Sequence, residues 1–287
     1  MKRRISVGIV AALVALVMAA PAFGASQTAA TAAAKGPTLN VFAAASLSHV
    51  FPAMVAPFKK LHPAWKNTNF AFNFQGTDTL VAQIEQGAPC NIFAGASTKY
   101  GNQLVTAGWV NATQNFCRNR LIVIMPAKNT ANLQTLGDLT KSGVLIAIGD
   151  PAVPIGTYTR TVLANVSKTG PFGTDFGAKV LANVVSEEVN VNAVVALVKI
   201  DEVDAGFVYV SDARAAGKSV KWMVIKNQYQ SNPLPTYPIA TTVAGKQSPA
   251  PTKQQGRISR SFIKYVMGAA GQKQLKAFGF LAPLPAS

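Results

Sequence analysis

Four short segments of the chain could hold a small anion without using a charged side chain. They cover residues 43–47, 74–80, 149–158 and 187–192, and hydroxyl, amide and turn-forming residues are concentrated in them. The segments follow or adjoin strand-like runs, and each leads into a pattern typical of a helix. In open α/β sheets, ligands bind where strands end and helices begin. We therefore expect these turns to meet around one ligand.

The first two segments offer side-chain hydroxyls. Ser46 follows three alanines, whose small side chains allow close approach to the backbone, and it stands at the expected N-cap of a helix. Thr77 follows Gly76, which permits a tight turn, and begins the next helix. Asp78 would repel an anion, so we expect it to cap that helix from outside the site. Taken alone, the first segment is explained better by capping without a ligand.

The third segment offers backbone amides. Pro154 has no N–H group and stiffens the turn, which leaves the amides of Ile155 and Gly156 free to point at a ligand. Asp150 is expected to brace this loop rather than to contact an anion.

The fourth segment and a tyrosine complete the set. Asn190 or Asn192 can cap a helix whose first amide donors include Val191. Tyr209, in the apolar run 205–210, adds a phenol donor, although such a tyrosine on its own more often belongs to a core. Neutral donors and helix dipoles can satisfy every oxygen of a dehydrated oxyanion. The absence of a counter-charge also favours release.

The turns must be positioned by the strands and helices on either side of them, and strand and helix patterns alternate along the chain. Strands are expected at 39–44, 70–74, 91–96, 116–125, 144–149, 205–210, 220–225 and 237–243. Helices are expected between them, at 47–58, 79–86 and 192–200 among others, with two short amphipathic helices in 256–278. The alternation predicts an α/β protein with mostly parallel sheets.

The N-terminus is typical of a secretory signal. Basic residues at 2–4 precede an uncharged apolar run from Ile5 to Ala20, and Pro21 ends it before small residues. The alternative, a membrane anchor, would need an apolar run of about 20 residues. We expect a signal peptide at 1–24, a flexible Ala/Thr-rich leader at 25–37, and a mature protein in the periplasm.

The charge balance is strongly basic, with 27 Lys and Arg against 11 Asp and Glu and a net charge of +16. Such a balance is common in nucleic-acid-binding proteins. The basic residues are scattered, however, and an exported protein rarely meets DNA, so no nucleic-acid partner is expected. A surface with few carboxylates changes little in charge as the pH falls. One hypothesis is therefore that the protein works in an acidic periplasm. The alternative is attraction to an anionic membrane surface or an acidic permease face.

Few residues could support catalysis or metal binding. An exported hydrolase, the rival class of function, would need a nucleophile–base pair or a metal cluster. The histidines are His49 and His62, at opposite ends of one expected helix, and no zinc-type spacing is present. We therefore expect no enzyme activity. The two cysteines, Cys90 and Cys117, could form a disulfide in an oxidising compartment or remain buried thiols.

Several segments, in order and well spaced from Leu39 to Phe280, resemble the molybdate-binding proteins of ABC transporters. They are 41–47, 82–89, 118–121, 147–151 and 208–213. The resemblance implies a type II periplasmic binding fold with a ligand cleft between two lobes. Lobe one would hold 38–119 with 238–287, and lobe two 120–237. It also implies a monomer that delivers its ligand to a permease at the inner membrane.

By motif position, the family's tetrahedral site falls on five residues that contact molybdenum only through its oxo ligands: Ser46, Thr77, Ile155, Val191 and Tyr209. The family usually has serine where this chain has Thr77, and the added methyl could tune selectivity. Cys90 and Asn91 replace a common alanine and aspartate away from the expected ligand. No carboxylate stands at the matched positions, which favours tetrahedral over octahedral binding. The expected ligand is molybdate or tungstate, without a cofactor; sulfate, thiosulfate or another small oxyanion is the alternative.

Overall fold

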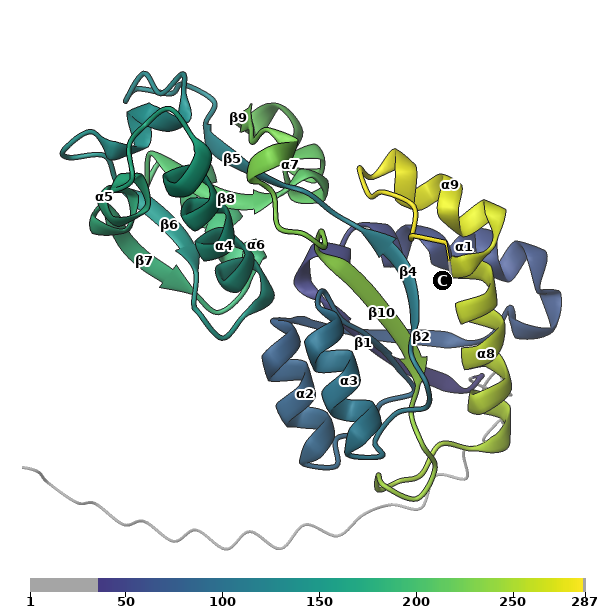
Figure 1. Cartoon of the computed structure of the whole chain (residues 1–287). Coiled ribbons are helices and arrows are strands. Elements are labelled where there is room, and N and C mark those ends of the chain that lie inside the picture. The colour runs from purple at the N-terminus through teal and green to yellow at the C-terminus, as the bar shows by residue number, and fades with distance from the viewer. Residues whose placement is uncertain (1–35, 286–287) are drawn as a thin grey trace, which may run out of the picture. The chain divides into compact units, whose positions relative to one another are not determined.

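The computed structural model describes residues 36–285 (Figure 1). The expected signal peptide, 1–24, lies outside the described residues, as does the expected leader, 25–37, except for its last two residues. Two five-stranded sheets, each with its own helices, make up the described part of the chain. We call each sheet with its helices a lobe.

Lobe one is built on the sheet of order β2-β1-β3-β10-β4. Its strands are β1 (Thr38–Ala44), β2 (Asn69–Gln75), β3 (Ile92–Ala94), β4 (Gln114–Arg118) and β10 (Thr236–Thr241). Its helices are α1 (Val50–Leu61), α2 (Thr77–Glu85), α3 (Thr98–Thr106), α8 (Lys253–Met267) and α9 (Ala269–Ala277), with short 3₁₀ turns η1 (Ala45–Leu47) and η2 (Pro63–Trp65).

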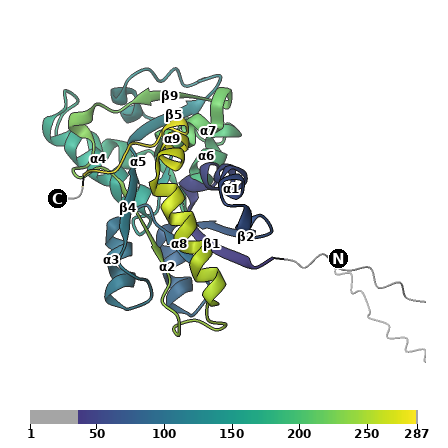
Figure 2. The same cartoon turned by 90° about the vertical axis from the view of Figure 1, so that its right-hand side faces the viewer.

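Helices cover both faces of this sheet (Figures 1 and 2). Because successive strand residues point to opposite faces, Val41 belongs to the core under α1, α8 and α9, whereas Phe42 belongs to the core under α2 and α3. Ile239 and Ala240 of β10 divide in the same way. The central strands of lobe one are therefore buried on both sides, which explains their nearly continuous apolar sequence.

Lobe two is built on the sheet of order β7-β6-β8-β5-β9. Its strands are β5 (Leu121–Pro126), β6 (Ile146–Gly149), β7 (Val184–Glu188), β8 (Ala205–Tyr209) and β9 (Val220–Val224). Its helices are α4 (Pro154–Thr169), α5 (Phe176–Ala182), α6 (Val191–Lys199) and α7 (Val210–Ala216), with 3₁₀ turns η3 (Leu136–Thr140), η4 (Gly217–Ser219) and η5 (Asn227–Tyr229).

The α/β class is confirmed, but the expectation of mostly parallel sheets is wrong. In lobe one, β10 runs antiparallel to both β3 and β4, and in lobe two β5 runs antiparallel to β8 and β9. The remaining pairs are parallel. The chain enters lobe two along β5 and returns to lobe one along β10, so these two strands oppose the direction of their neighbours. The expected strand 116–125 is also two strands, because the chain changes sheet at Asn119 and Arg120.

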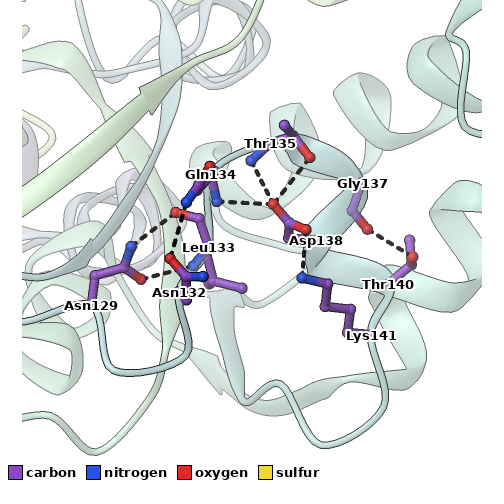
Figure 3. A network of polar contacts seen from close by, with 9 residues as sticks. All are labelled: Asn129, Asn132, Leu133, Gln134, Thr135, Gly137, Asp138, Thr140 and Lys141. Carbon is purple, nitrogen blue, oxygen red and sulfur yellow. Dashed lines mark hydrogen bonds and ion pairs between the residues drawn. The ribbon is translucent and has the colours of Figure 1, made fainter.

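A polar network fixes the long connection between β5 and β6 (Figure 3). Asp138 accepts hydrogen bonds from the backbone N–H groups of Gln134 and Thr135, and it forms an ion pair with Lys141 at 2.7 Å. Lys141 and these N–H donors hold the pKa of the Asp138 carboxyl well below its usual value. The Thr135–Asp138 capping box of this network fixes the start of η3 within the connection.

The possible disulfide between Cys90 and Cys117 is not formed. Both thiols are free and buried. Cys90 packs in the cluster under α2 and α3, where its thiol donates to the carbonyl of Ile92 at 3.2 Å, while Cys117 packs in the other cluster of lobe one. Since the sheet separates the two clusters, the alternative of two buried thiols is the one that the structure supports.

None of the helices within residues 36–285 is long and apolar enough to cross a membrane.

Candidate ligand-binding site

A small pocket lies between the two lobes, at the carboxyl ends of strands from both sheets, where the predicted turns meet. The volume of the cavity itself is about 20 Å³. All five residues predicted from the sequence line it, together with neighbours from the same turns: Ala44, Ala45, Ser46, Gln75, Gly76, Thr77, Ala96, Val153, Pro154, Ile155, Asn190, Val191 and Tyr209. Pockets for drug-sized molecules span about 300–1,000 Å³, so this one suits a smaller ligand.

None of the 13 lining residues carries a charged side chain. The polar groups that face the pocket are hydroxyls, side-chain amides and the N–H groups at helix starts. Such groups bind an anion through dipoles and hydrogen bonds. A neutral donor set of this kind was the basis of the sequence prediction, and the structure gathers it in one place.

Ser46 lies in the 3₁₀ turn η1 and is not the N-cap of a helix, contrary to our expectation. The helix α1 starts four residues later and has His49 as its N-cap. The Ser46 side chain is buried, and its Oγ lies 2.9 Å from the phenol oxygen of Tyr237. Ser46 still lines the pocket, so the 3₁₀ turn after β1 changes its local structure and not its place in the site.

Thr77 is the first residue of α2, as predicted, and is almost fully buried. Its Oγ1 accepts a hydrogen bond from the backbone N–H of Ala96 at 3.0 Å, which leaves the hydroxyl hydrogen available for a ligand. The methyl group packs beside Gly95, where an added Cβ would lie 2.9 Å from it. Asp78 does not cap α2: the helix has no side-chain cap, and Oδ1 of Asp78 is buried without a partner in the described part of the chain.

Ile155 is the second residue of α4, after Pro154. An N–H group in this first turn has no partner inside its own helix, so it can serve a ligand. Gly156 lets the turn close tightly, because a Cβ there would lie 1.9 Å from the carbonyl oxygen of Asp150. The Asp150 carboxylate accepts the N–H of Ala152 at 2.8 Å and so braces the loop, as expected.

Val191 is the first residue of α6, and its N–H is one of the unpaired donors at that helix start. Of the two asparagines considered as caps, Asn190 is the one used: its Oδ1 accepts from the N–H of Ala193 at 3.2 Å. Asn192 instead reaches lobe one, where its Nδ2 donates to Oγ of Ser48 at 3.3 Å.

Tyr209 ends β8 and is 1% exposed. Its hydroxyl is buried without a hydrogen-bond partner in the described structure, although it belongs to a residue that lines the pocket. Burial, together with the nearby phenol of Tyr237, raises the pKa of Tyr209 well above its usual value. The group is therefore a neutral donor, and its backbone is held by a bond from its N–H to Asp212 at 2.9 Å.

Contacts between the lobes surround the pocket. The Tyr100 hydroxyl of lobe one donates to the carbonyl of Ala152 in lobe two. Gly76 lies so close to Val189 of lobe two that a Cβ on the glycine would be 2.6 Å from the Val189 carbonyl oxygen. With the bond between Asn192 and Ser48, these contacts place the lobes in a closed arrangement. Sequence reasoning missed Tyr100, because a single aromatic residue in a short helix gives no sign of a partner beyond its own lobe.

Two α/β lobes with an uncharged pocket between the carboxyl ends of their strands define a two-lobed α/β binding protein. A family model described as bacterial extracellular solute-binding protein matches residues 39–281. The chain belongs to this family and, within it, to the molybdate-binding proteins.

Individual relatives fit this placement. The molybdate-binding protein ModA of Mycobacterium tuberculosis is 32% identical, with 97% of this chain and 98% of the relative covered. The periplasmic molybdate-binding protein of Azotobacter vinelandii shares the fold with a TM-score of 0.69 at 19% identity, covering 86% of this chain and 100% of that one. The sulfate-binding protein SubI of Mycobacterium tuberculosis has the same TM-score at 15% identity, covering 87% and 88%. The fold alone therefore does not distinguish one oxyanion from another.

Proposed function

We propose that this protein is the periplasmic substrate-binding component of an ABC importer and that its ligand is molybdate or tungstate. The protein binds and releases the anion without changing it chemically, and it needs no cofactor. Its partner is the permease at the inner membrane, which would recognise the closed lobes of a monomer. Relatives named as molybdate-binding proteins support this choice of anion.

The observation that carries the proposal is the buried hydroxyl of Tyr209. An unpaired buried polar group costs about 1–3 kcal/mol, so native structures rarely keep one without a reason. Here the hydroxyl belongs to a pocket that also presents Ser46, Thr77 and the N-termini of α4 and α6. An oxyanion bound among these groups would accept from the hydroxyl and remove the penalty.

The direct test is calorimetric titration of the purified protein with molybdate, tungstate, sulfate and phosphate. We expect molybdate and tungstate to bind with dissociation constants of about 1 μM or lower, which corresponds to about −8 kcal/mol. Sulfate should bind at least about tenfold more weakly, a difference of about 1.4 kcal/mol. Sulfate binding as tight as molybdate binding would assign the protein to sulfate uptake instead.

A matched pair of variants tests the site. Tyr209→Phe removes one donor to a charged ligand, so the affinity for molybdate should fall by about 1.5–3 kcal/mol. The ligand-free protein should be no less stable, because the lost hydroxyl has no partner there. Tyr229→Phe is the control, since Tyr229 is a buried tyrosine of lobe two that does not line the pocket. Unchanged molybdate binding by Tyr209→Phe would exclude Tyr209 from the site.

A further inference from the structure

A chain of buried hydrogen bonds lies behind Ser46 and is not needed to form the pocket wall. The Oγ of Ser46 is 2.9 Å from the phenol oxygen of Tyr237. Asn119 Nδ2 lies 3.5 Å from that phenol oxygen and 2.9 Å from Oγ of Ser211. All four residues are buried. Polar groups so far from water raise the question of which one donates to which.

The orientation of the Asn119 side chain follows from its neighbours. Its Oδ1 accepts the backbone N–H of Arg120 at 2.9 Å, so the amide nitrogen must face the other way, toward Ser211 and Tyr237. An amide NH₂ group has two hydrogens and can only donate. Asn119 therefore presents a donor, and not an acceptor, to the phenol oxygen of Tyr237.

This arrangement determines the direction of the next bond. Tyr237 is fully buried, and burial raises the pKa of its phenol well above the usual value, so the hydroxyl keeps its proton. Its hydrogen-bond neighbours in the described structure are Asn119 and Ser46. Since Asn119 offers only hydrogens, the Tyr237 hydroxyl must donate its hydrogen bond to Oγ of Ser46. The hydrogen of Ser46 is then left to point into the pocket.

We propose that Asn119 and Tyr237 form a relay that fixes the Ser46 hydroxyl as a donor, so that the pocket selects fully deprotonated oxyanions over anions that carry a proton. The relay deepens the proposed function and rests on it. Molybdate, tungstate and sulfate present only acceptor oxygens at neutral pH. Phosphate carries at least one hydrogen, which needs an acceptor in the site.

The Thr77 hydroxyl of lobe one is also held as a donor, in this case by a backbone N–H group. Thr77 accepts the N–H of Ala96, so its hydrogen is also free for the ligand. The amides of Ile155 and Val191 cannot accept at all. A hydrogen on a ligand oxygen that faces Ser46, Thr77 or these two amides would therefore meet a donor and no acceptor, and an unmet polar hydrogen in a closed pocket costs about 1–3 kcal/mol.

Tyr237→Phe tests the relay directly. The ring keeps its edge-on contacts with Phe116 and Phe280, while Ser46 loses its donor and becomes free to accept from a ligand. Molybdate affinity should fall about tenfold, and phosphate affinity should hold or rise, so that the molybdate-to-phosphate ratio drops at least tenfold. An unchanged ratio would overturn the proposal.

The control is Tyr265→Phe, which also removes a tyrosine hydroxyl from lobe one. That hydroxyl accepts from Nε2 of Gln274 at 3.2 Å on the helical layer, and Tyr265 does not line the pocket. Its variant should bind both anions as the unmodified protein does. Thermal unfolding of each ligand-free variant identifies any loss of folding. If Tyr237→Phe does not fold, Asn119→Ala provides the same test. We expect it to lower the molybdate-to-phosphate affinity ratio, and an unchanged ratio would contradict the relay.

A double-mutant cycle with Ser46→Ala separates the relay from a general structural role. Tyr237 is a positioning residue that acts through Ser46, so Tyr237→Phe should change molybdate affinity less than about twofold when Ser46 is already alanine. An equal effect in both backgrounds would mean that Tyr237 acts by another route, and the relay would be wrong.

The unmodified protein reports separately on the proposed function. If it binds sulfate in preference to molybdate, the choice of molybdate fails, and the same cycle with sulfate and phosphate still decides the relay. If it binds none of the four oxyanions, both proposals fail.

Discussion

The two lobes supply hydrogen-bond donors to one pocket in different ways. Lobe one contributes the side-chain hydroxyls of Ser46 and Thr77, whereas lobe two contributes the first amides of α4 and α6 and the phenol of Tyr209. A backbone amide at a helix start has its direction set by the helix. A hydroxyl rotates freely, so it needs a further group to direct it. Tyr237 and the N–H of Ala96 have this role in lobe one.

The difference predicts which substitutions matter in each lobe. Side-chain donors can be deleted one at a time without moving the backbone. Amide donors are lost only when the turn that presents them is deformed, and glycine positions control those turns. Substitutions at glycines and hydroxyls therefore test the contrast between the lobes.

The largest effect is expected for Gly156→Ala in lobe two. The added Cβ would lie 1.9 Å from the carbonyl oxygen of Asp150 and 2.3 Å from that of Gly149. Since both are backbone atoms, the turn must shift, with an expected loss of about 3 kcal/mol or more of unfolding free energy. Molybdate binding should be lost with it, as measured by denaturant unfolding and calorimetry.

Gly256→Ala in α8 is the matched control for this change. The nearest atom to its Cβ would be Nη1 at the end of the flexible Arg260 side chain, 3.5 Å away. A stability gain of about 0.4–1 kcal/mol with normal binding is expected. If Gly156→Ala behaves like Gly256→Ala, the amides of lobe two do not depend on the tight turn.

Gly76→Ala in lobe one should break binding by another route. Its Cβ would lie 2.6 Å from the Val189 carbonyl oxygen across the pocket and 2.6 Å from Asp78 Oδ1. We expect the lobes to be held apart and the affinity to fall about 100-fold or more, equal to about 2.7 kcal/mol. The unfolding free energy should change little, and small-angle scattering with molybdate should show failure to close. A stability loss as large as that of Gly156→Ala would contradict this contrast.

Thr77→Val sharpens the comparison by removing one hydroxyl at nearly constant shape. The affinity for molybdate should fall by about 1–3 kcal/mol, because the ligand loses a donor. Thr77→Ser keeps the hydroxyl and should keep the affinity, with a stability loss of about 1 kcal/mol from the missing methyl beside Gly95. If the serine variant binds as poorly as the valine variant, shape and not hydrogen bonding accounts for the role of Thr77.

The smallest effect on affinity is expected for Asp212→Asn, which changes pH dependence instead. Burial raises the pKa of Asp212 from 3.8 to about 7. Between these values the unfolded chain releases a proton that the folded protein keeps, so stability falls as pH rises from about 4 to about 7. The variant should lack this slope and be more stable than the unmodified protein at pH 8, by up to about 4 kcal/mol at 1.36 kcal/mol per pKa unit.

Denaturation at pH 4, 6 and 8 measures how the free energy of unfolding depends on pH. Asp138→Asn is a comparison in which the removed carboxyl contributes a pH dependence of opposite sign. The lowered pKa of Asp138 stabilises the fold above the usual carboxyl pKa, and this contribution is lost as pH falls. Asp138→Asn should therefore be least stable, relative to the unmodified protein, near neutral pH. Parallel curves for Asp212→Asn and the unmodified protein would show that Asp212 ionises normally when folded.

The sequence was sufficient to predict the pocket where the deciding information is local. Strand ends, glycines and Pro154 mark the turns, and a helix start presents its amides wherever it occurs. The local pattern therefore indicates the amides of Ile155, Gly156 and Val191, and the family resemblance selects Ile155 and Val191 among them. Ser46 was placed correctly in the pocket but in the wrong local structure, because a 3₁₀ turn after a strand has no sequence pattern distinct from that of an N-cap.

The relay residues could not be predicted, since their contacts join distant parts of the chain. Ser46 and Tyr237 are 191 positions apart, and Asn119 and Tyr237 are 118 apart. Tyr237 stands in an apolar strand and has the pattern of a core residue. The direction of β10 was missed for a related reason: periodicity shows that a segment is a strand, but only the full topology shows which neighbours it joins.

The position of β10 also sets an order of assembly. It lies between β3 and β4, so β4 has no sheet neighbour until residues beyond 235 are available. All five strands of lobe two lie between residues 121 and 224, in one continuous stretch. For a chain that emerges N-terminus first, lobe two can fold while lobe one waits for its last strand. Tyr237 arrives on that strand, so the hydroxyls of lobe one are directed only after nearly the whole chain has emerged, and ligand capture is deferred until synthesis and export are almost complete.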